Sequence, residues 1–226
     1  MTWVKICGAT SADDAMLAVE AGADAVGVIF APSARRVTPP EAAAIVLQVP
    51  ASVEKVGVFV NEAPTTIVNI AEVAGLTTVQ LHGDEDIRYI QDFRQVAVEH
   101  GLRLRVVKAV AVRPSFEEAI AEFVKPAAID ALLLDSPPAS EQVARGGSGR
   151  TFDWELAAAA LASLKIPVIV GGGLSPGNVA QAIARLQPWG VDVCSGVERE
   201  PGKKDAAKIR AFVAAARAYA ANQVGR

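Results

Sequence analysis

"WVKICGATSADDAMLAVEAGADAVGVIF", residues 3–30, holds a short apolar run, a segment with helical signals and a second apolar run. Ser11 can cap a helix, acidic residues fill its first turn, and Gly22 can end it. Continuous apolar runs are typical of parallel strands that are covered on both faces. The stretch therefore predicts a strand, a helix and a second strand that is parallel to the first.

The same alternation continues along the chain. We expect strands at 3–8, 24–30, 54–60, 77–83, 104–110, 129–135, 167–173 and 191–196. Ser175 and Pro176 are expected to open a helix over 175–186, and the last helix is expected over about 203–222. Because no linker or change of composition separates the units, residues 1–226 are predicted to form one domain.

Strict alternation of strands and helices allows an open doubly wound sheet or a closed barrel. An open sheet would suggest a dinucleotide-binding fingerprint, but "GGGLSPG" (171–177) lacks its spacing and follows the seventh expected strand. Eight units of about 28 residues each favour the barrel. We therefore predict an α/β fold, a single-domain (β/α)8 TIM barrel.

The overall composition excludes several classes of function. The net charge of -3 gives no electrostatic case for binding nucleic acid or an anionic membrane. There is no signal-peptide pattern, and no apolar run reaches the roughly 18 residues of a membrane span. Two cysteines are too few for a disulfide framework, which fits a reducing compartment. We expect a cytoplasmic protein.

In this fold the active site lies at the C-terminal ends of the strands. The polar residues expected there are Cys7, Arg35 or Arg36, Asn61, His82, Lys108, Asp135 and Ser195. Cys7 is either a small buried hydrophobe or a reactive thiol, and its place at a strand end favours the thiol. Asp135 is either a loop cap or an acid kept protonated by apolar surroundings. His82 contacts either a ligand or its own loop, and Lys108 is expected at the barrel mouth.

Two glycine-rich segments, "IVGGGL" (169–174) and "VCSGVE" (193–198), close the last two strands. Barrels often bind phosphate through backbone N–H groups at these loops. The predicted phosphate site consists of Gly172, Gly173, Ser195 and Gly196, although the glycines could serve tight turns alone. No residues have the spacing of metal ligands, so no metal is expected.

The longest irregular stretch, "SPPASEQVARGGSGRTF" (136–152), directly follows Asp135. It is longer than ordinary connections and is therefore either a lid or a disordered loop. A lid over a proton-transfer site would exclude water when it closes.

Ten motifs occur in a fixed order along the chain. They are "KICGAT" (5–10), "GADAVGVIF" (22–30), "SARRV" (33–37), "VGVFVN" (56–61), "VQLHG" (79–83), "LLLDS" (132–136), "GGSGRTFDW" (146–154), "GGL" (172–174), "VDVCSGVE" (191–198) and "PGKKD" (201–205). Together they resemble the phosphoribosylanthranilate isomerase family of tryptophan biosynthesis. The resemblance implies a (β/α)8 enzyme that converts N-(5-phosphoribosyl)anthranilate to 1-(2-carboxyphenylamino)-1-deoxyribulose 5-phosphate by an Amadori rearrangement. It also implies a small phosphosugar substrate and neither cofactor nor metal.

The resemblance assigns roles to four residues. Cys7 matches the general base that removes a proton from C2′, and Asp135 matches the general acid that protonates the furanose oxygen. Arg36 matches an arginine that holds the substrate, through a bidentate contact with the anthranilate carboxylate. His82 matches a histidine that is expected to bind the substrate. Such a base and acid need opposite protonation states, as in other acid–base pairs.

Cys194 departs from the family pattern, in which a small hydroxyl residue or a similar one usually occupies this position. The first and eighth strands of a closed barrel are neighbours, so Cys7 and Cys194 could approach each other. Oxidation of the pair would then silence the base. A Cα separation above about 7 Å would exclude a direct disulfide.

Three rival functions fit the sequence less well. The histidine-pathway isomerase has an aspartate where Cys7 stands, and indole-glycerol-phosphate synthase needs a lysine-centred site that Lys108 alone does not provide. A non-catalytic phosphosugar-binding protein would require neither Cys7 nor Asp135. We expect a monomer, with a dimer as the alternative.

Overall fold

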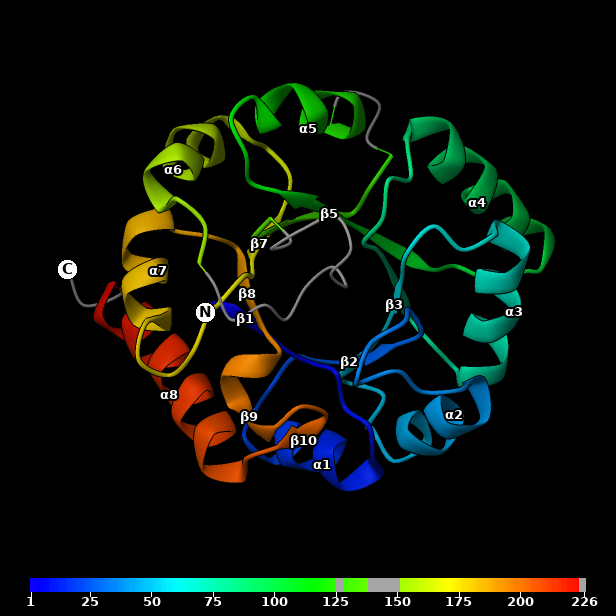
Figure 1. Ribbon diagram of the computed structural model, residues 1–226, viewed down its shortest axis with the longest axis horizontal. Coiled ribbons are helices and arrows are strands. Elements are labelled where there is room, and N and C mark those ends of the chain that lie inside the picture. Colours follow the sequence, from blue (N-terminus) through cyan, green and yellow to red (C-terminus); the bar gives the residue numbers. More distant parts are fainter. Residues whose placement is uncertain (125–127, 138–150, 224–226) are drawn as a thin grey trace.

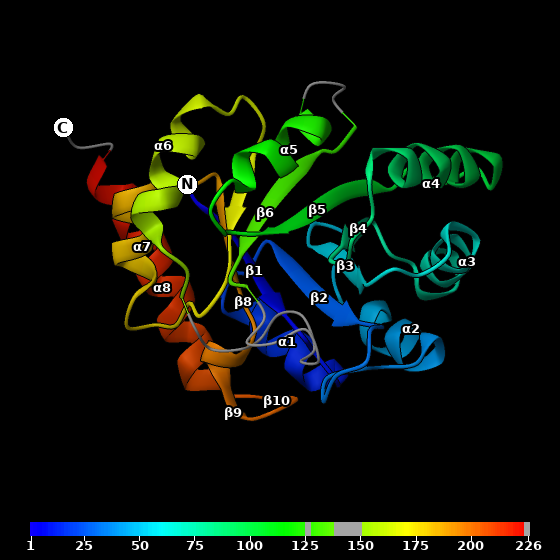
Figure 2. The same ribbon diagram turned by 45° about the horizontal axis from the view of Figure 1, so that its top comes forward.

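A computed structural model describes residues 1–124, 128–137 and 151–223. Within these residues, eight parallel strands follow one another in chain order around a closed barrel. Helices surround the barrel on all sides (Figure 1), and the strands are tilted in the turned view (Figure 2). The predicted (β/α)8 barrel is confirmed.

The elements in the described part of the chain have the following bounds. The strands of the barrel are β1 (Trp3–Cys7), β2 (Ala25–Ile29), β3 (Glu54–Phe59), β4 (Thr78–Leu81), β5 (Arg105–Ala111), β6 (Ala131–Asp135), β7 (Val168–Val170) and β8 (Gly190–Val193). The helices are α1 (Ala12–Glu20), α2 (Pro39–Leu47), α3 (Pro64–Ala74), α4 (Ile87–Glu99), α5 (Phe116–Val124), α6 (Trp154–Ser163), α7 (Val179–Leu186) and α8 (Ala206–Gln223). A 3₁₀ turn, η1 (Ser195–Val197), and a hairpin of β9 (Glu198–Glu200) and β10 (Lys203–Lys204) lie between β8 and α8.

Alternation along the strands separates the barrel interior from the layer under the helices. Val4 and Ile6 of β1 belong to the large core that the helices share. Trp3 instead packs on a second cluster, formed by residues of β5, β6 and β7. These strands meet β1 only across the interior, and residues two apart point to the same face. Lys5 and Cys7 therefore face the interior with Trp3.

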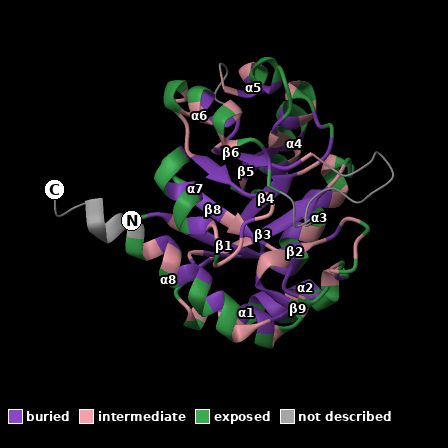
Figure 3. Cartoon of the chain, turned by 60° about the vertical axis from the view of Figure 1, so that its left-hand side comes forward, coloured by how far each residue is buried: buried purple, intermediate pink, exposed green. Residues whose placement is uncertain are grey.

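The burial pattern agrees with this arrangement. The strands are mostly buried, and exposed residues gather on the outer faces of the helices (Figure 3). Ser11 caps α1 as expected, since its Oγ accepts a hydrogen bond from the N–H of Asp14 at 3.1 Å. In the described residues, no helix combines the length and the apolar character that crossing a membrane requires.

Most element boundaries differ by up to four residues from the sequence-based expectation, and three of the differences have a clear physical reason. β7 ends at Val170, because Gly172 and Gly173 have φ angles of +69° and +64°, which a strand cannot contain. α7 begins at Val179 rather than after Ser175, because a turn precedes it. α8 begins later than expected because the preceding residues pair in the β9–β10 hairpin.

The expected lid over 136–152 falls largely on residues 138–150. These residues lie outside the described part of the chain.

Candidate active site

Cys7 and Asp135 are the last residues of β1 and β6. Both are buried, and both follow an interior-facing residue two positions earlier, Lys5 and Leu133. In the closed ring, β6 is separated from β1 by β7 and β8. The thiol and the carboxyl group therefore both face the barrel interior at its C-terminal end, from different sides of the ring.

Charged groups surround the Cys7 thiol. Lys5 lies two residues before Cys7 on the same interior face of β1, and its Nζ lies 3.0 Å from Oδ1 of Asp192 on β8. A Cβ atom at Gly27 of β2 would lie 2.9 Å from Cys7 Sγ and 3.1 Å from Lys5 Cε. The absence of a side chain at Gly27 thus makes room for the thiol and the ammonium group.

The surroundings of Cys7 favour its thiolate form. A hydrogen bond with Cys194 lowers the pKa of Cys7, burial opposes this, and Lys5 and Lys204 lower the pKa further. Burial raises the pKa of Asp192 to about 6 against the opposing effect of Lys5. Burial acts to lower the pKa of Lys5, but Asp192 and Cys7 raise it overall, so Lys5 stays charged. The sulfur thus lies beside a permanent buried cation.

Asp135 is hydrogen-bonded through both carboxyl oxygens. Oδ1 accepts the N–H of Ser136 at 2.7 Å, and Oδ2 lies 3.1 Å from Nε2 of His82. The other ring nitrogen of His82 lies 2.8 Å from the side-chain nitrogen of Gln80. Because an amide nitrogen can only donate, Nδ1 accepts from Gln80, and Nε2–H donates to Asp135.

Gln80 is a site residue that the sequence analysis did not identify. It lies two residues before His82 and is buried on the same face of β4. This spacing in "VQLHG" is the signal that could have identified it, although such spacing alone does not show that two side chains bond.

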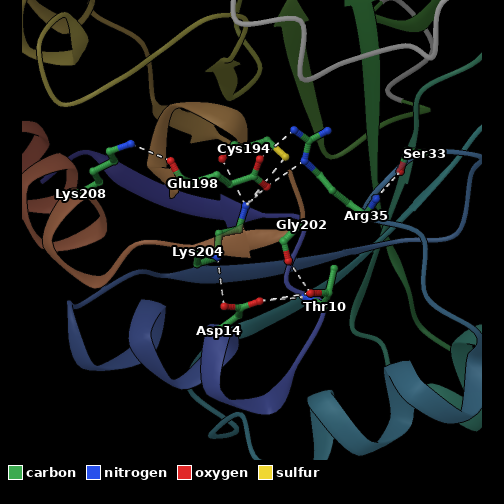
Figure 4. Close-up of polar contacts among 9 residues, drawn as sticks. All are labelled: Thr10, Asp14, Ser33, Arg35, Cys194, Glu198, Gly202, Lys204 and Lys208. Carbon is green, nitrogen blue, oxygen red and sulfur yellow. Dashed lines mark hydrogen bonds and ion pairs between the residues drawn. The ribbon is translucent and has the colours of Figure 1, made fainter. Parts of the chain in front are cut away.

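The two neighbouring arginines after β2 have different environments. Nε and Nη2 of Arg35 each donate to a carboxyl oxygen of Glu198, both at 2.8 Å (Figure 4). Arg36 is exposed, and its guanidinium has no hydrogen-bond partner among the described residues. Arg36 is therefore the arginine that is available to a ligand.

The predicted phosphate-binding residues come together at the ends of β7 and β8. Gly173, Ser195 and Gly196 line a cavity of about 680 Å³, with Ser175 and Asn178. Asn178 Oδ1 accepts the N–H of Ser175 at 2.8 Å, which shapes the turn before α7. Gly173, Ser195 and Gly196 thus surround a space at the N-terminus of a helix, where an anion is favoured.

Gly172, the fourth predicted residue, has a different surrounding. A Cβ atom there would lie 2.3 Å from Ser136 Oγ and 2.9 Å from Asp135 Oδ1. Gly172 therefore allows the segment that carries the acid to pack closely.

A second cavity, of about 360 Å³, is lined by His82, Asp135 and Ser136, among others. Lys108 also borders it, but this side chain alternates with the interior residues of β5 and points toward the helices. Its Nζ lies 2.8 Å from both the carbonyl oxygen of Gly83 and Oε2 of Glu85. Lys108 thus borders the cavity beside His82 and Asp135, but its ammonium group is held in a buried ion pair and does not face the barrel interior.

In the described ranges, no group of three or more His, Cys, Asp or Glu residues is arranged to hold a metal. The groups described above can bind an anion and transfer protons.

Relatives of the chain share one activity. The family model described as N-(5′-phosphoribosyl)anthranilate (PRA) isomerase matches residues 4–215. N-(5′-phosphoribosyl)anthranilate isomerases of Pelobacter propionicus and Desulforudis audaxviator are each 45% identical to the chain. The first alignment covers 94% of both proteins, and the second covers 96% of this chain and 98% of the relative.

Solved structures give the same result. Phosphoribosyl anthranilate isomerase from Thermotoga maritima is 41% identical, with a TM-score of 0.83 over 96% of this chain and 100% of that chain. A phosphoribosyl anthranilate isomerase in complex with reduced 1-(o-carboxyphenylamino)-1-deoxyribulose 5-phosphate is 38% identical, with a TM-score of 0.80 and the same coverage. A further structure shows monomers generated from the dimeric Thermotoga maritima enzyme, at 39% identity, a TM-score of 0.79 and the same coverage.

Proposed function

The chain belongs to the N-(5′-phosphoribosyl)anthranilate isomerase family, and from this premise we propose that Cys7 and Asp135 are the base and the acid of the reaction. The protein catalyses this isomerisation in tryptophan biosynthesis. The observation that carries the assignment is the location of a thiolate-favouring cysteine and a hydrogen-bonded carboxyl group on two walls of one barrel mouth. Binding alone would require neither group.

The first step is the opening of the sugar ring. Asp135 in its protonated form gives its proton to the furanose oxygen as the bond from C1′ to that oxygen breaks, and the Nε2–H of His82 donates a hydrogen bond to the carboxylate that is left. The lone pair of the anthranilate nitrogen forms the C=N bond of a Schiff base. General acid catalysis of this kind contributes roughly 10²- to 10⁴-fold to a rate.

The second step is proton abstraction from C2′. The Cys7 thiolate takes the proton, the C–H electrons form a double bond between C1′ and C2′, and the C=N electrons return to nitrogen. The resulting enolamine tautomerises to the ketone. Lys5 remains charged throughout, because Asp192 and Cys7 both favour its ammonium form.

The remaining predicted residues hold the substrate. Arg36 is free to bind the anthranilate carboxylate, since Glu198 engages Arg35 instead. The cavity at Gly173, Ser195 and Gly196 accepts the phosphate at the N-terminus of α7.

Fluorescence of the anthranilate group gives a direct test. The fluorescence of phosphoribosylanthranilate should fall as the purified protein converts it to product. It should stay constant with a doubly substituted Cys7→Ser/Asp135→Asn protein. Unchanged fluorescence with the folded, unmodified protein would contradict the function, and equal rates for both proteins would contradict the residue assignment.

His82 offers a separate prediction, because it contacts Asp135 directly. In His82→Asn we expect kcat to fall by roughly 10- to 100-fold while KM changes little, since orientation of the acid is lost and the phosphate site is intact. His100→Asn, a change of the exposed histidine after α4, is the matched control. A rise in KM with unchanged kcat would support the substrate-binding role that the sequence suggested.

A monomer in a reducing cytoplasm is the proposed physiological form. The exposed large hydrophobic residues of the described chain are Met1, Leu47, Val73, Val98 and Trp189. Exposed apolar side chains are common on the surfaces of monomers. Both cysteines are free, as a thiolate base requires. Sedimentation equilibrium should give 23.5 kDa, and twice that mass would establish a dimer.

A further inference from the structure

Cys194 lies beside the catalytic sulfur. Ile6 pairs with Val193 in the register of β1 and β8, so the next residues, Cys7 and Cys194, are neighbours. Lys5 and Asp192, one register step earlier, face each other in the barrel interior, so the side chains of Cys7 and Cys194 face the same interior. Adjacent strands are about 4.8 Å apart, which is within the limit of about 7 Å for a disulfide, so oxidation of the pair remains a prediction.

A buried ion-pair network holds Cys194 in place. Nζ of Lys204 lies 3.2 Å from the carbonyl oxygen of Cys194, 4.0 Å from its Sγ and 2.9 Å from Oε1 of Glu198 (Figure 4). Arg35 binds the same carboxylate through two nitrogens. Lys204 is itself fixed by its backbone N–H, which donates to Asp14 of α1 at 3.2 Å.

We propose that Cys194 is a positioning residue for the base: its S–H donates a hydrogen bond to Cys7 and holds the Cys7 sulfur as a thiolate at the mouth of the barrel. The inference rests on the proposed role of Cys7 as the base. A hydrogen bond to a charged acceptor is stronger than one between neutral groups, so this contact favours the ionised form of Cys7 over the neutral thiol.

The charges around the pair decide which sulfur keeps the proton. The groups that face it are Lys5 of β1, Arg35 after β2, Asp192 of β8, Glu198 of β9 and Lys204 of β10. Each ammonium group is also paired with a carboxylate, Lys5 with Asp192 at 3.0 Å and Lys204 with Glu198 at 2.9 Å. The hydrogen bond with Cys7 and burial raise the pKa of Cys194, although Lys204 opposes them. Cys194 therefore keeps its proton and acts as the donor.

Two substitutions of Cys194 distinguish a role as hydrogen-bond donor from a role that only fills space. Cys194→Ala removes the donor, whereas Cys194→Ser replaces the thiol by a hydroxyl donor of similar size. In Cys194→Ala we expect the midpoint of Cys7 ionisation to rise by roughly one to two pH units, with the rising limb of kcat/KM moving by the same amount. Cys194→Ser should keep both midpoints close to those of the unmodified protein.

The ionisation is measured without turnover, by the ultraviolet absorbance of the thiolate and by the pH dependence of alkylation. A Cys7→Ser background supplies the baseline for both signals, and circular dichroism verifies the fold. Unmoved midpoints in Cys194→Ala, or equal shifts in Cys194→Ala and Cys194→Ser, would overturn the inference. If instead the proposed role of Cys7 as the base is wrong, the result is different: Cys7→Ser then retains turnover, whatever the titration of Cys194→Ala shows.

Discussion

Cys7→Ser is expected to lower kcat by roughly 10²- to 10⁴-fold, the range for loss of a general base. A serine hydroxyl can still accept the hydrogen bond from Cys194, but it does not ionise near neutral pH. In the unmodified protein, the lowered pKa of Cys7 keeps the thiolate available at a lower pH than for a free thiol. The activity of the unmodified protein should therefore rise with pH through this lowered pKa. The residual activity of the serine variant should lack this rise. Steady-state fluorescence assays across pH measure both effects.

The control for Cys7→Ser is Cys7→Ser/Cys194→Ser, which excludes Cys194 as a substitute base. Binding of the reduced product analogue, measured by calorimetry, should persist in both variants because the phosphate and carboxylate contacts remain. Near-normal kcat in the correctly folded double variant would refute the role of Cys7.

Asp135→Asn is expected to cause a comparable loss in kcat, again roughly 10²- to 10⁴-fold. The amide has nearly the shape of the carboxyl group and can still accept the N–H of Ser136, but it has no proton to donate to the ring oxygen. Its NH₂ group would also face the Nε2–H of His82, and because both groups are donors, this hydrogen bond would be lost. Turnover of phosphoribosylanthranilate measures this loss directly.

The matched control for Asp135→Asn is Asp130→Asn, immediately before the same strand. Asp130 is partly exposed and pairs with Arg94, at the opposite end of β6 from the acid. The substitution Asp130→Asn should leave kcat almost unchanged. A loss in Asp130→Asn as large as in Asp135→Asn would show that the effect is structural rather than chemical.

The local signals in the sequence were sufficient for the barrel. Apolar runs and helix caps such as Ser11 depend on residues that are close in sequence, so they predict which segments form strands and helices. Because the active site of a TIM barrel lies at the C-terminal ends of its strands, Cys7 and Asp135 could then be predicted to lie at one end of the barrel. Boundaries failed where a more distant contact decides them, as in the turn that Asn178 ties before α7.

Contacts between distant segments could not be predicted from local patterns. Sequence alone did not choose between Arg35 and Arg36, because the choice depends on Glu198, which is 163 residues from Arg35. The same holds for Lys5 with Asp192, which are 187 residues apart. The sequence pattern places Lys204 in the last helix, but Lys204 belongs to the β9–β10 hairpin. Its ammonium group donates a hydrogen bond to the carbonyl oxygen of Cys194.

A crystal structure of this protein with reduced 1-(o-carboxyphenylamino)-1-deoxyribulose 5-phosphate tests the central claim most directly. We predict that Cys7 Sγ lies roughly 3–3.5 Å from C2′ of the analogue, the separation of groups poised to react. The Asp135 carboxyl group should lie within hydrogen-bond reach of the oxygen that closes the furanose ring in the substrate. An analogue seated with C2′ beyond contact of Cys7, or with that oxygen turned away from Asp135, would contradict the account.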